Sequence, residues 1–222
     1  MIGHYAQTTA AREHLALKDF EEAGVRAAVR HFLAKDLIFA PGDPDTHLYF
    51  LLSGTVRLYK FYGRYKEATV ALLKDGGVFG ELSLEEGSRQ EVFAEAVTDA
   101  RVAVVRKPAL AEAMKRSPRF AMKLLFSFSE RLRQSEEVIE SLLDREVSAR
   151  LATLLVHLAE RFGETNGSGT VLNLRLTHQD LANMIVSTRE AVSKVMSEFQ
   201  RDGLIEVRNR RIVISPRLAE MF

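Results

Sequence analysis

Residues 37–105 contain a succession of short apolar runs, and this succession restricts the fold more than any other feature of the chain. The runs cover residues 37–40, 47–53, 55–61, 68–73, 91–96 and 100–105. Between them lie turn-forming segments rich in Gly, Pro and Asp, such as Pro41-Gly42-Asp43-Pro44. Many short strands separated by such turns predict an antiparallel β-sandwich, roll or barrel.

Helical periodicity replaces this pattern on both sides of the β region. One or two short helices are expected within residues 10–34, where they would cover the β domain. After the β region we expect, in chain order, a short helix at 108–117, a long helix at 118–143, an amphipathic helix at 144–162, a surface loop at 163–170 and a strand at 171–176.

The long helix carries one narrow apolar stripe. Its members recur at spacings of 3, 4, 3, 4 and 3 residues, as in the seam of a coiled coil. They are Leu125, Phe128, Leu132, Ser135, Ile139 and Leu142. The stripe could pack on the chain's own β domain or on a second copy, and we favour a parallel homodimer.

Two short helices are predicted near the C-terminus. Thr177 is a suitable N-cap for the first, and Asp180 follows three residues later, as in a capping box. The chain breaks at 186–188, and the second helix covers 189–201. Val186 occupies a turn position where Gly is commonly preferred for positive φ, so either the backbone is strained or the turn has another shape.

A basic hairpin follows, with strands at 204–207 and 212–214 around Arg208-Asn209-Arg210-Arg211. Helix, turn, helix and hairpin in this order predict a winged helix-turn-helix, whereas any one of the helices alone could be an ordinary helix with a solvated face. The candidate DNA-binding residues are Thr177, Gln179, Ser187, Thr188, Arg189, Glu190, Ser193, Lys194, Arg208, Arg210 and Arg211. Because 31 basic and 30 acidic residues leave a formal net charge of +1, binding to DNA must come from such a local patch.

The chain resembles the cyclic-AMP receptor protein/FNR (Crp/Fnr) family of bacterial transcription regulators over nearly its whole length. The motifs that carry the resemblance are Pro41-Gly42-Asp43, Leu51-Leu52-Ser53-Gly54-Thr55-Val56, Val78-Phe79-Gly80-Glu81-Leu82-Ser83-Leu84 and Ser187-Thr188-Arg189-Glu190-Ala191-Val192-Ser193-Lys194-Val195. The spacing from Phe79 to Val97, and residues 131–139, are most similar to the subgroup that contains the cyanobacterial nitrogen-control regulator.

The resemblance implies an α+β fold in three parts. Residues 1–117 would form an antiparallel β-roll of the cyclic-nucleotide-binding, jelly-roll type with covering helices, 118–144 a central dimerisation helix, and 145–222 the winged helix-turn-helix. It also implies a homodimer on a palindromic operator in double-stranded DNA, and contact with RNA polymerase. Arg189, Glu190 and Lys194 would read bases, with weaker discrimination by Lys194 because the family's usual Arg binds in a bidentate way.

The resemblance further implies a small-molecule effector in the β-roll. The candidate effector-binding residues are Phe79, Gly80, Glu81, Leu82, Ser83, Arg89, Arg131 and Ser135. Arg89 could reach into this pocket or be an exposed loop residue.

The identity of the effector stays open at this stage. Cyclic-AMP binders hold the phosphate with an Arg-Ser or Arg-Thr pair, but Arg89 is followed here by Gln90 and Glu91, and a carboxylate would repel a phosphate. The nitrogen regulator uses an arginine for 2-oxoglutarate where this chain has Val92. We therefore expect no effector or a metabolite other than cyclic AMP. The alternatives are a cyclic-AMP-responsive activator and a cyclic-nucleotide-like module that controls another protein.

Several other functions are disfavoured by what the sequence lacks. The chain has no Cys, which excludes thiol catalysis, cysteine-ligated iron–sulfur clusters and Cys-ligated zinc, and no other metal site is predicted. A haem sensor would need an axial ligand, for which His31 and His47 are the nominal candidates. Both are better interpreted as surface histidines. Adjacent carboxylates such as Glu85 and Glu86 do not form an acid/base pair across a substrate, so we expect no enzyme. With no secretory signal and no apolar run of membrane-spanning length, a cytoplasmic protein without a membrane partner is expected.

Overall fold

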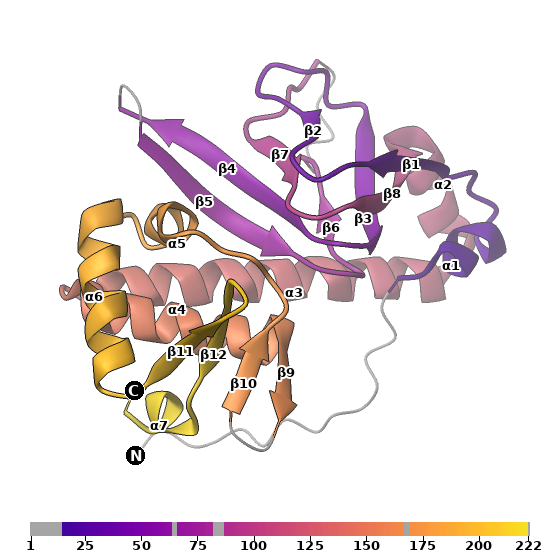
Figure 1. Ribbon diagram of the computed structural model, residues 1–222. Helices are drawn as coiled ribbons and strands as arrows, with labels where there is room; N and C mark the ends of the chain where they lie inside the picture. The colour runs from indigo at the N-terminus through magenta and orange to yellow at the C-terminus, as the bar shows by residue number, and fades with distance from the viewer. Residues whose placement is uncertain (1–14, 64–65, 82–86, 167–168, 222) are drawn as a thin grey trace.

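The computed structural model describes residues 15–63, 66–81, 87–166 and 169–221. The long helix α3 (Pro118–Leu143) runs through the middle of the molecule (Figure 1). A β domain lies over one part of it, and a helical domain with a small sheet lies at its C-terminal end.

The β domain consists of two four-stranded antiparallel sheets, which confirms the predicted β-roll. One sheet has the order β1-β8-β3-β6, with β1 at Ala28–Phe32, β8 at Ala100–Arg106, β3 at His47–Ser53 and β6 at Val78–Phe79. The other has the order β2-β7-β4-β5, with β2 at Leu37–Phe39, β7 at Phe93–Ala96, β4 at Val56–Tyr62 and β5 at Lys66–Leu73. Side chains alternate along each strand, so the core between the sheets takes every second residue, such as Leu51, Leu58 and Val102.

A second core lies on the other face of the β1-β8-β3-β6 sheet. Helices α1 (Leu17–Glu22) and α2 (Lys107–Arg116) and the start of α3 cover that face. Phe20 of α1 packs edge-to-face on Phe50 of β3 at 4.5 Å and on Phe120 of α3 at 5.3 Å between ring centroids. These contacts attach the central helix to the β domain.

The helices predicted for residues 10–34 are only partly correct. Residues 17–22 are helical, but Ala28–Phe32 is the edge strand β1, paired with β8 from Ala28↔Val104 to Phe32↔Ala100. The mixed apolar spacing suited either structure, and the open edge of β8 decides between them by supplying backbone hydrogen-bond partners. Residues 10–14 lie outside the described ranges.

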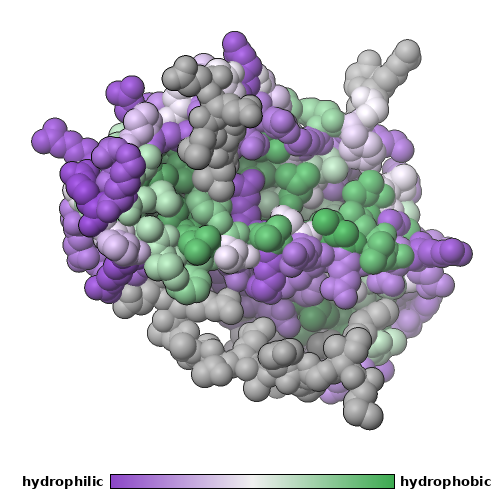
Figure 2. All heavy atoms as spheres, turned by 180° about the vertical axis from the view of Figure 1, so that it is seen from behind, coloured by the Kyte–Doolittle hydropathy of each residue, from purple (hydrophilic) through white to green (hydrophobic). Residues whose placement is uncertain are grey.

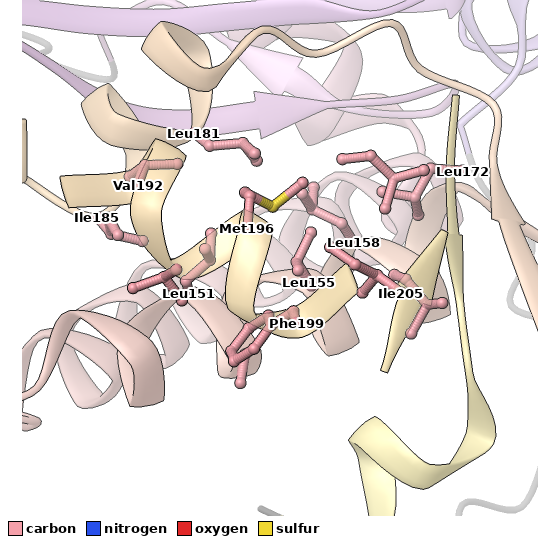
Figure 3. Packing of buried hydrophobic residues seen from close by; sticks show 14 of the residues in the cluster. Leu151, Leu155, Leu158, Leu172, Leu181, Ile185, Val192, Met196, Phe199 and Ile205 are labelled. Carbon is pink, nitrogen blue, oxygen red and sulfur yellow. The ribbon is translucent and has the colours of Figure 1, made fainter. Parts of the chain in front are cut away.

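The C-terminal half is built on α4 (Val147–Phe162). Its sheet has the order β11-β12-β10-β9, with β9 at Gly163–Asn166, β10 at Gly169–Leu172, β11 at Ile205–Arg208 and β12 at Arg211–Ile214. The predicted loop at 163–170 and strand at 171–176 are therefore wrong in their bounds, because β9 and β10 pair from Gly163↔Leu172 to Gly169↔Asn166. Helices α5 (His178–Met184), α6 (Arg189–Arg201) and α7 (Pro216–Glu220) complete this half, with the core shown in Figure 3.

Three of the six residues of the apolar stripe of α3 are exposed in the single chain. Leu125, Leu132 and Ile139 are 57%, 62% and 61% exposed, whereas Phe120 and Leu124 on the inner side are buried. Figure 2 shows hydrophobic side chains gathered across the middle of the face that is turned away in Figure 1. The chain's own β domain covers the stripe only in part: Phe128 is half-buried against the core under the β-roll, while Leu125, Leu132 and Ile139 stay open.

A buried ion pair fastens α1 to α3. Lys123 Nζ lies 2.7 Å from Asp19 Oδ1, and the other carboxylate oxygen of Asp19 accepts from the backbone N–H of Ala16. Burial alone would raise the pKa of Asp19, but the Lys123 hydrogen bond, the Ala16 N–H and the charges of Lys123 and Lys18 lower it below its ordinary value.

We predict that Lys123→Met lowers the free energy of unfolding by about 3–5 kcal/mol, because it leaves a buried carboxylate without its cation. Since the pKa of Asp19 is lowered on folding, its stabilisation is present at neutral pH and is lost as the pH falls through the folded-state pKa. Urea unfolding at neutral and acidic pH measures both effects. An unchanged midpoint for Lys123→Met at neutral pH would show that the pair contributes nothing.

Candidate DNA-binding site and effector pocket

The first helix of the C-terminal pair begins at the predicted cap. Thr177 Oγ1 accepts from the backbone N–H of Asp180 at 3.1 Å, and the Asp180 carboxylate accepts from the Thr177 N–H at 2.7 Å. The reciprocal bonds form a complete capping box, and the exposed residues Thr177 and Gln179 lie at this start of α5.

The second helix, α6, has one buried face and one exposed face. Thr188 is its N-cap and accepts from the N–H of Ala191 at 3.2 Å. Val192, Val195, Met196 and Phe199 are buried against α4 and α5 (Figure 3). Thr188, Arg189, Glu190 and Lys194 are exposed, so the long polar side chains at the start of α6 are free to meet a ligand.

Two predicted DNA-binding residues are less open. Ser187 is half-buried in the turn, where its N–H donates to the carbonyl of Ala182 at 2.9 Å. Ser193 is also half-buried, and its hydroxyl lies 2.7 Å from Nδ1 of His178. His178 was missed by the sequence reasoning, because only folding brings it beside α6.

The turn between α5 and α6 is strained. Val186 has φ of 51°, in the left-handed region that β-branched residues rarely adopt. Of the two alternatives raised by the sequence, the structure therefore has the strained backbone and not a different turn.

The wing is tighter than predicted. Arg208 and Arg211 pair as strand residues, so only Asn209 and Arg210 form the loop, with φ of 51° and 62°. Positive φ at both central residues is the type I′ hairpin turn. Arg208 is held by Glu206 in an exposed ion pair at 2.5 Å, which offsets part of its charge.

A hollow of about 330 Å³ lies beside the wing, lined by Val171, Arg175, Arg208, Asn209, Arg211 and Val213. Arg211 Nη1 donates to Asn173 Oδ1 at 3.4 Å. Three arginines around one depression suit an anion such as a phosphate. The sequence reasoning missed Arg175. The one sequence feature that could have identified it as a DNA-binding candidate is its place just before the Thr177 cap.

The candidate effector residues fall into two groups. Phe79 is buried, Gly80 has φ of 100°, and Arg131 of α3 donates to the Gly80 carbonyl at 3.3 Å. Burial lowers the pKa of Arg131, and the charge of the half-buried Glu81 opposes this shift. The Ser135 hydroxyl donates to the Arg131 carbonyl at 3.1 Å, while Leu82 and Ser83 lie outside the described residues.

Arg89 belongs to the other group. It is exposed, pairs with Pro44 in an isolated β-bridge and donates to the Gly42 carbonyl at 2.5 Å. The neighbouring Gln90 is buried and donates to Asp45 Oδ1 at 3.0 Å. The exposed-loop alternative is therefore the one that the structure has for Arg89.

The two residues after Gln90 also have other partners. Glu91 is exposed and forms an ion pair with Lys60 at 3.1 Å, and Val92 is buried in the core between the sheets. No hydroxyl occupies the position of the family's phosphate pair in this segment.

Two histidines of the sequence are nominal haem ligands. His31 is exposed, and His47 is half-buried with Nδ1 at 2.8 Å from Thr46 Oγ1. Burial and the charges of Arg106 and Arg30 lower the pKa of His47. Within the described ranges there is no group of three or more His, Asp or Glu side chains placed to hold a metal ion. None of the helices in this part of the chain has both the length and the hydrophobicity of a membrane span.

Comparisons with known proteins agree with this geometry. Residues 149–219 match the Crp-like helix-turn-helix domain, and residues 29–117 match the cyclic nucleotide-binding domain. The global nitrogen regulator of Nostoc sp. (strain PCC 7120) is 35% identical over 188 residues, which are 84% of each chain. The CRP-like cAMP-activated global transcriptional regulator of Mycobacterium tuberculosis is 28% identical over 178 residues, 80% of each chain. These relatives are transcription regulators and not enzymes.

Solved structures show the same architecture. A CRP/FNR-family transcriptional regulator from Thermus thermophilus has a TM-score of 0.72 at 30% identity, covering 87% of this chain and 97% of that one. The c-di-GMP-responsive global regulator CLP of Xanthomonas campestris has a TM-score of 0.76 at 24% identity, covering 89% and 98%. The second likeness concerns the fold alone.

We predict that Val186→Gly raises the free energy of unfolding by about 1 kcal/mol. Glycine adopts positive φ without the steric cost of about 1–2 kcal/mol that a side chain incurs there, and this gain exceeds the roughly 0.4–1 kcal/mol by which glycine's greater freedom stabilises the unfolded chain. Thermal unfolding should show a midpoint about 2–4 °C higher. A lower midpoint would mean that the strain is offset by contacts of this valine.

Proposed function

Because this chain belongs to the Crp/Fnr family of DNA-binding transcription regulators, we propose that two copies of it join along α3 and bind an inverted-repeat operator. The observation that carries the proposal is the exposed apolar stripe of α3 together with the exposed polar face of α6. The first is a surface that a second copy can cover, and the second is a surface that DNA can contact.

The stripe suits a second copy of the same helix. Leu125, Leu132 and Ile139 recur at coiled-coil spacing, and Phe128, Ser135 and Leu142 fill the positions between them. Burying such side chains contributes about 1.5–3 kcal/mol each, so a paired helix is favoured over a solvated one. Two α6 helices related by a two-fold axis would then read half-sites about 34 Å apart.

The DNA contacts divide into base readout and backbone contacts. Arg189, Glu190 and Lys194 lie on the exposed face of α6, and we assign base readout to them. We assign phosphate contacts to Thr177, Gln179, Ser187, Thr188, Ser193, Arg208, Arg210 and Arg211, and we add Arg175 from the hollow beside the wing. Contact with RNA polymerase is also proposed and rests on the family resemblance alone.

For the β-roll we propose a small-molecule effector other than cyclic AMP, or none. Arg131 beside the Gly80 carbonyl is a half-buried cation that an anionic metabolite could neutralise. On the other side, Arg89 binds the turn at Gly42, and Glu91 places a negative charge near the position of the missing phosphate pair. Of the described residues, Phe79, Gly80, Glu81 and Ser135 would line such a site.

We predict that Arg189→Ala abolishes binding to an operator selected from random duplex DNA while the protein stays dimeric. Losing one base contact in each half-site should cost about 2–6 kcal/mol for the dimer, since a good bidentate contact discriminates by about 1–3 kcal/mol. Gel-shift titration measures the affinity, and size-exclusion chromatography with light scattering measures the mass. Unchanged affinity would disprove the recognition assignment, and a monomeric wild type would disprove the dimer. A wild type without affinity for any duplex DNA would favour a module that controls another protein.

Calorimetric titration with millimolar cyclic AMP tests the effector proposal. We predict no saturable heat, because Arg89 donates to the Gly42 carbonyl and is followed by Gln90 and Glu91, not by a hydroxyl residue that could hold the cyclic phosphate. A saturable site would identify the chain as a cyclic-AMP-responsive regulator.

A further inference from the structure

Three polar side chains connect the β-roll to the DNA-binding half. Glu67 Oε1 of β5 accepts from Asn183 Nδ2 of α5 at 2.8 Å, and Asn183 Oδ1 accepts from Gln179 Nε2 at 2.7 Å. Asn183 is buried, whereas Gln179 is exposed on the side where α5 begins. We propose that Glu67 is a positioning residue that orients Gln179 toward a DNA phosphate through Asn183; this inference rests on the proposed function. We call these three residues the Glu67 relay.

Glu67 is itself held firmly. Arg57 of β4 contacts Glu67 at 2.5 Å and Glu95 of β7 at 3.3 Å, and its guanidinium lies 4.4 Å from the centre of the Tyr59 ring. Burial alone would lower the pKa of Arg57, but the hydrogen bond to Glu95 and the charges of Glu67 and Glu95 raise it. The relay therefore begins at a carboxylate whose place is set by three strands of one sheet.

The carboxylate also sets the direction of both amides. An ionised carboxylate only accepts hydrogen bonds, so Asn183 must turn its NH₂ group toward Glu67 and its oxygen toward Gln179. Gln179 must then donate through Nε2, which has a second N–H left for another acceptor. A charge in the β-roll thus fixes which atoms Gln179 presents at the predicted DNA-binding face.

Packing around the relay keeps the two halves in place. Leu72, on the same strand as Glu67, is buried in the core of the DNA-binding half. Arg161 of α4 donates to the Leu72 carbonyl at 2.7 Å and to Gln134 Oε1 of α3 at 3.0 Å. Figure 1 shows β4 and β5 reaching across to α5, so the hairpin is the part of the β-roll that lies against the first helix of the pair.

The relay gives the β-roll a route to the DNA-binding face that does not pass along α3. A shift of the β4–β5 hairpin relative to α5 would break the Glu67–Asn183 bond and free Gln179. A fixed side chain loses less conformational entropy when it binds, so an intact relay should favour the contact with DNA.

Gel-shift titration of Glu67→Ala, Gln179→Ala and the double variant tests the relay. We expect each single variant to weaken DNA binding about five- to a hundredfold, because the dimer loses one hydrogen bond in each of its two half-sites, and the double variant to be no weaker than Gln179→Ala. Glu67→Gln keeps an acceptor and should bind within about twofold of the wild type. Glu112→Ala, which removes an exposed ion pair with Lys115 in the same domain, is the matched control and should bind like the wild type.

The affinity for random duplex DNA supplies the second readout. A phosphate contact carries no sequence information, so Glu67→Ala should weaken specific and random DNA by the same factor. Wild-type affinity for Glu67→Ala, additive losses in the double variant, or a loss confined to the operator would each overturn the relay. Arg189→Ala in the same assay separates the two hypotheses: if it binds the operator like the wild type, the proposed function fails, whereas if it alone loses the operator, only the relay fails.

Discussion

Helix α3 must satisfy two sets of neighbours, and the arrangement of both halves of the chain depends on this. Its 26 residues extend about 39 Å at about 1.5 Å per residue. At one end Phe120 and Leu124 belong to the core under the β-roll, and toward the other end Gln134 accepts from Arg161 of α4. The opposite side of the helix is the open stripe around Leu132. A second helix on that stripe would therefore be connected, through α3, to both the β-roll and the DNA-binding half.

Helices α3, α5 and α6 were predictable from the sequence because local signals define them. Strand β1 was not, because it depends on long-range pairing. The caps at Thr177 and Thr188 satisfy backbone groups within three residues, so both helices begin where the sequence predicts. Strand β1 depends instead on β8, far along the chain, and its own residues suit a helix equally well. For the same reason the sequence could not reveal the neighbours of Glu67 or His178, because their partners arrive only through folding. The predicted DNA-binding residues were recognisable because an exposed polar face opposite a buried one is a periodic pattern.

The candidate effector residues form two separate groups of contacts. Arg131 of α3 donates to the Gly80 carbonyl across the boundary between roll and helix. Arg89 and Gln90 instead attach their loop to Gly42 and Asp45. A partly desolvated cation with a lowered pKa gains most from a nearby anion. An effector recognised by Arg131 would consequently act on α3 directly, one residue away from Leu132 of the stripe.

The two connections between the β-roll and the DNA-binding half cannot contribute equally to a switch. Moving a two-state equilibrium from 1:99 to 99:1 requires a differential affinity of about 10⁴-fold, or about 5.5 kcal/mol. Hydrogen bonds of the kind that form the Glu67 relay contribute about 0.5–1.5 kcal/mol each, so the relays of two half-sites together amount to about 1–3 kcal/mol and can adjust DNA affinity but cannot by themselves turn it on. Several apolar side chains of the α3 stripe, each worth about 1.5–3 kcal/mol when covered, can supply the larger amount. The magnitudes therefore favour the proposed pairing of α3 as the source of a large change in DNA affinity, and they leave a tuning role to the proposed relay from Glu67 to Asn183.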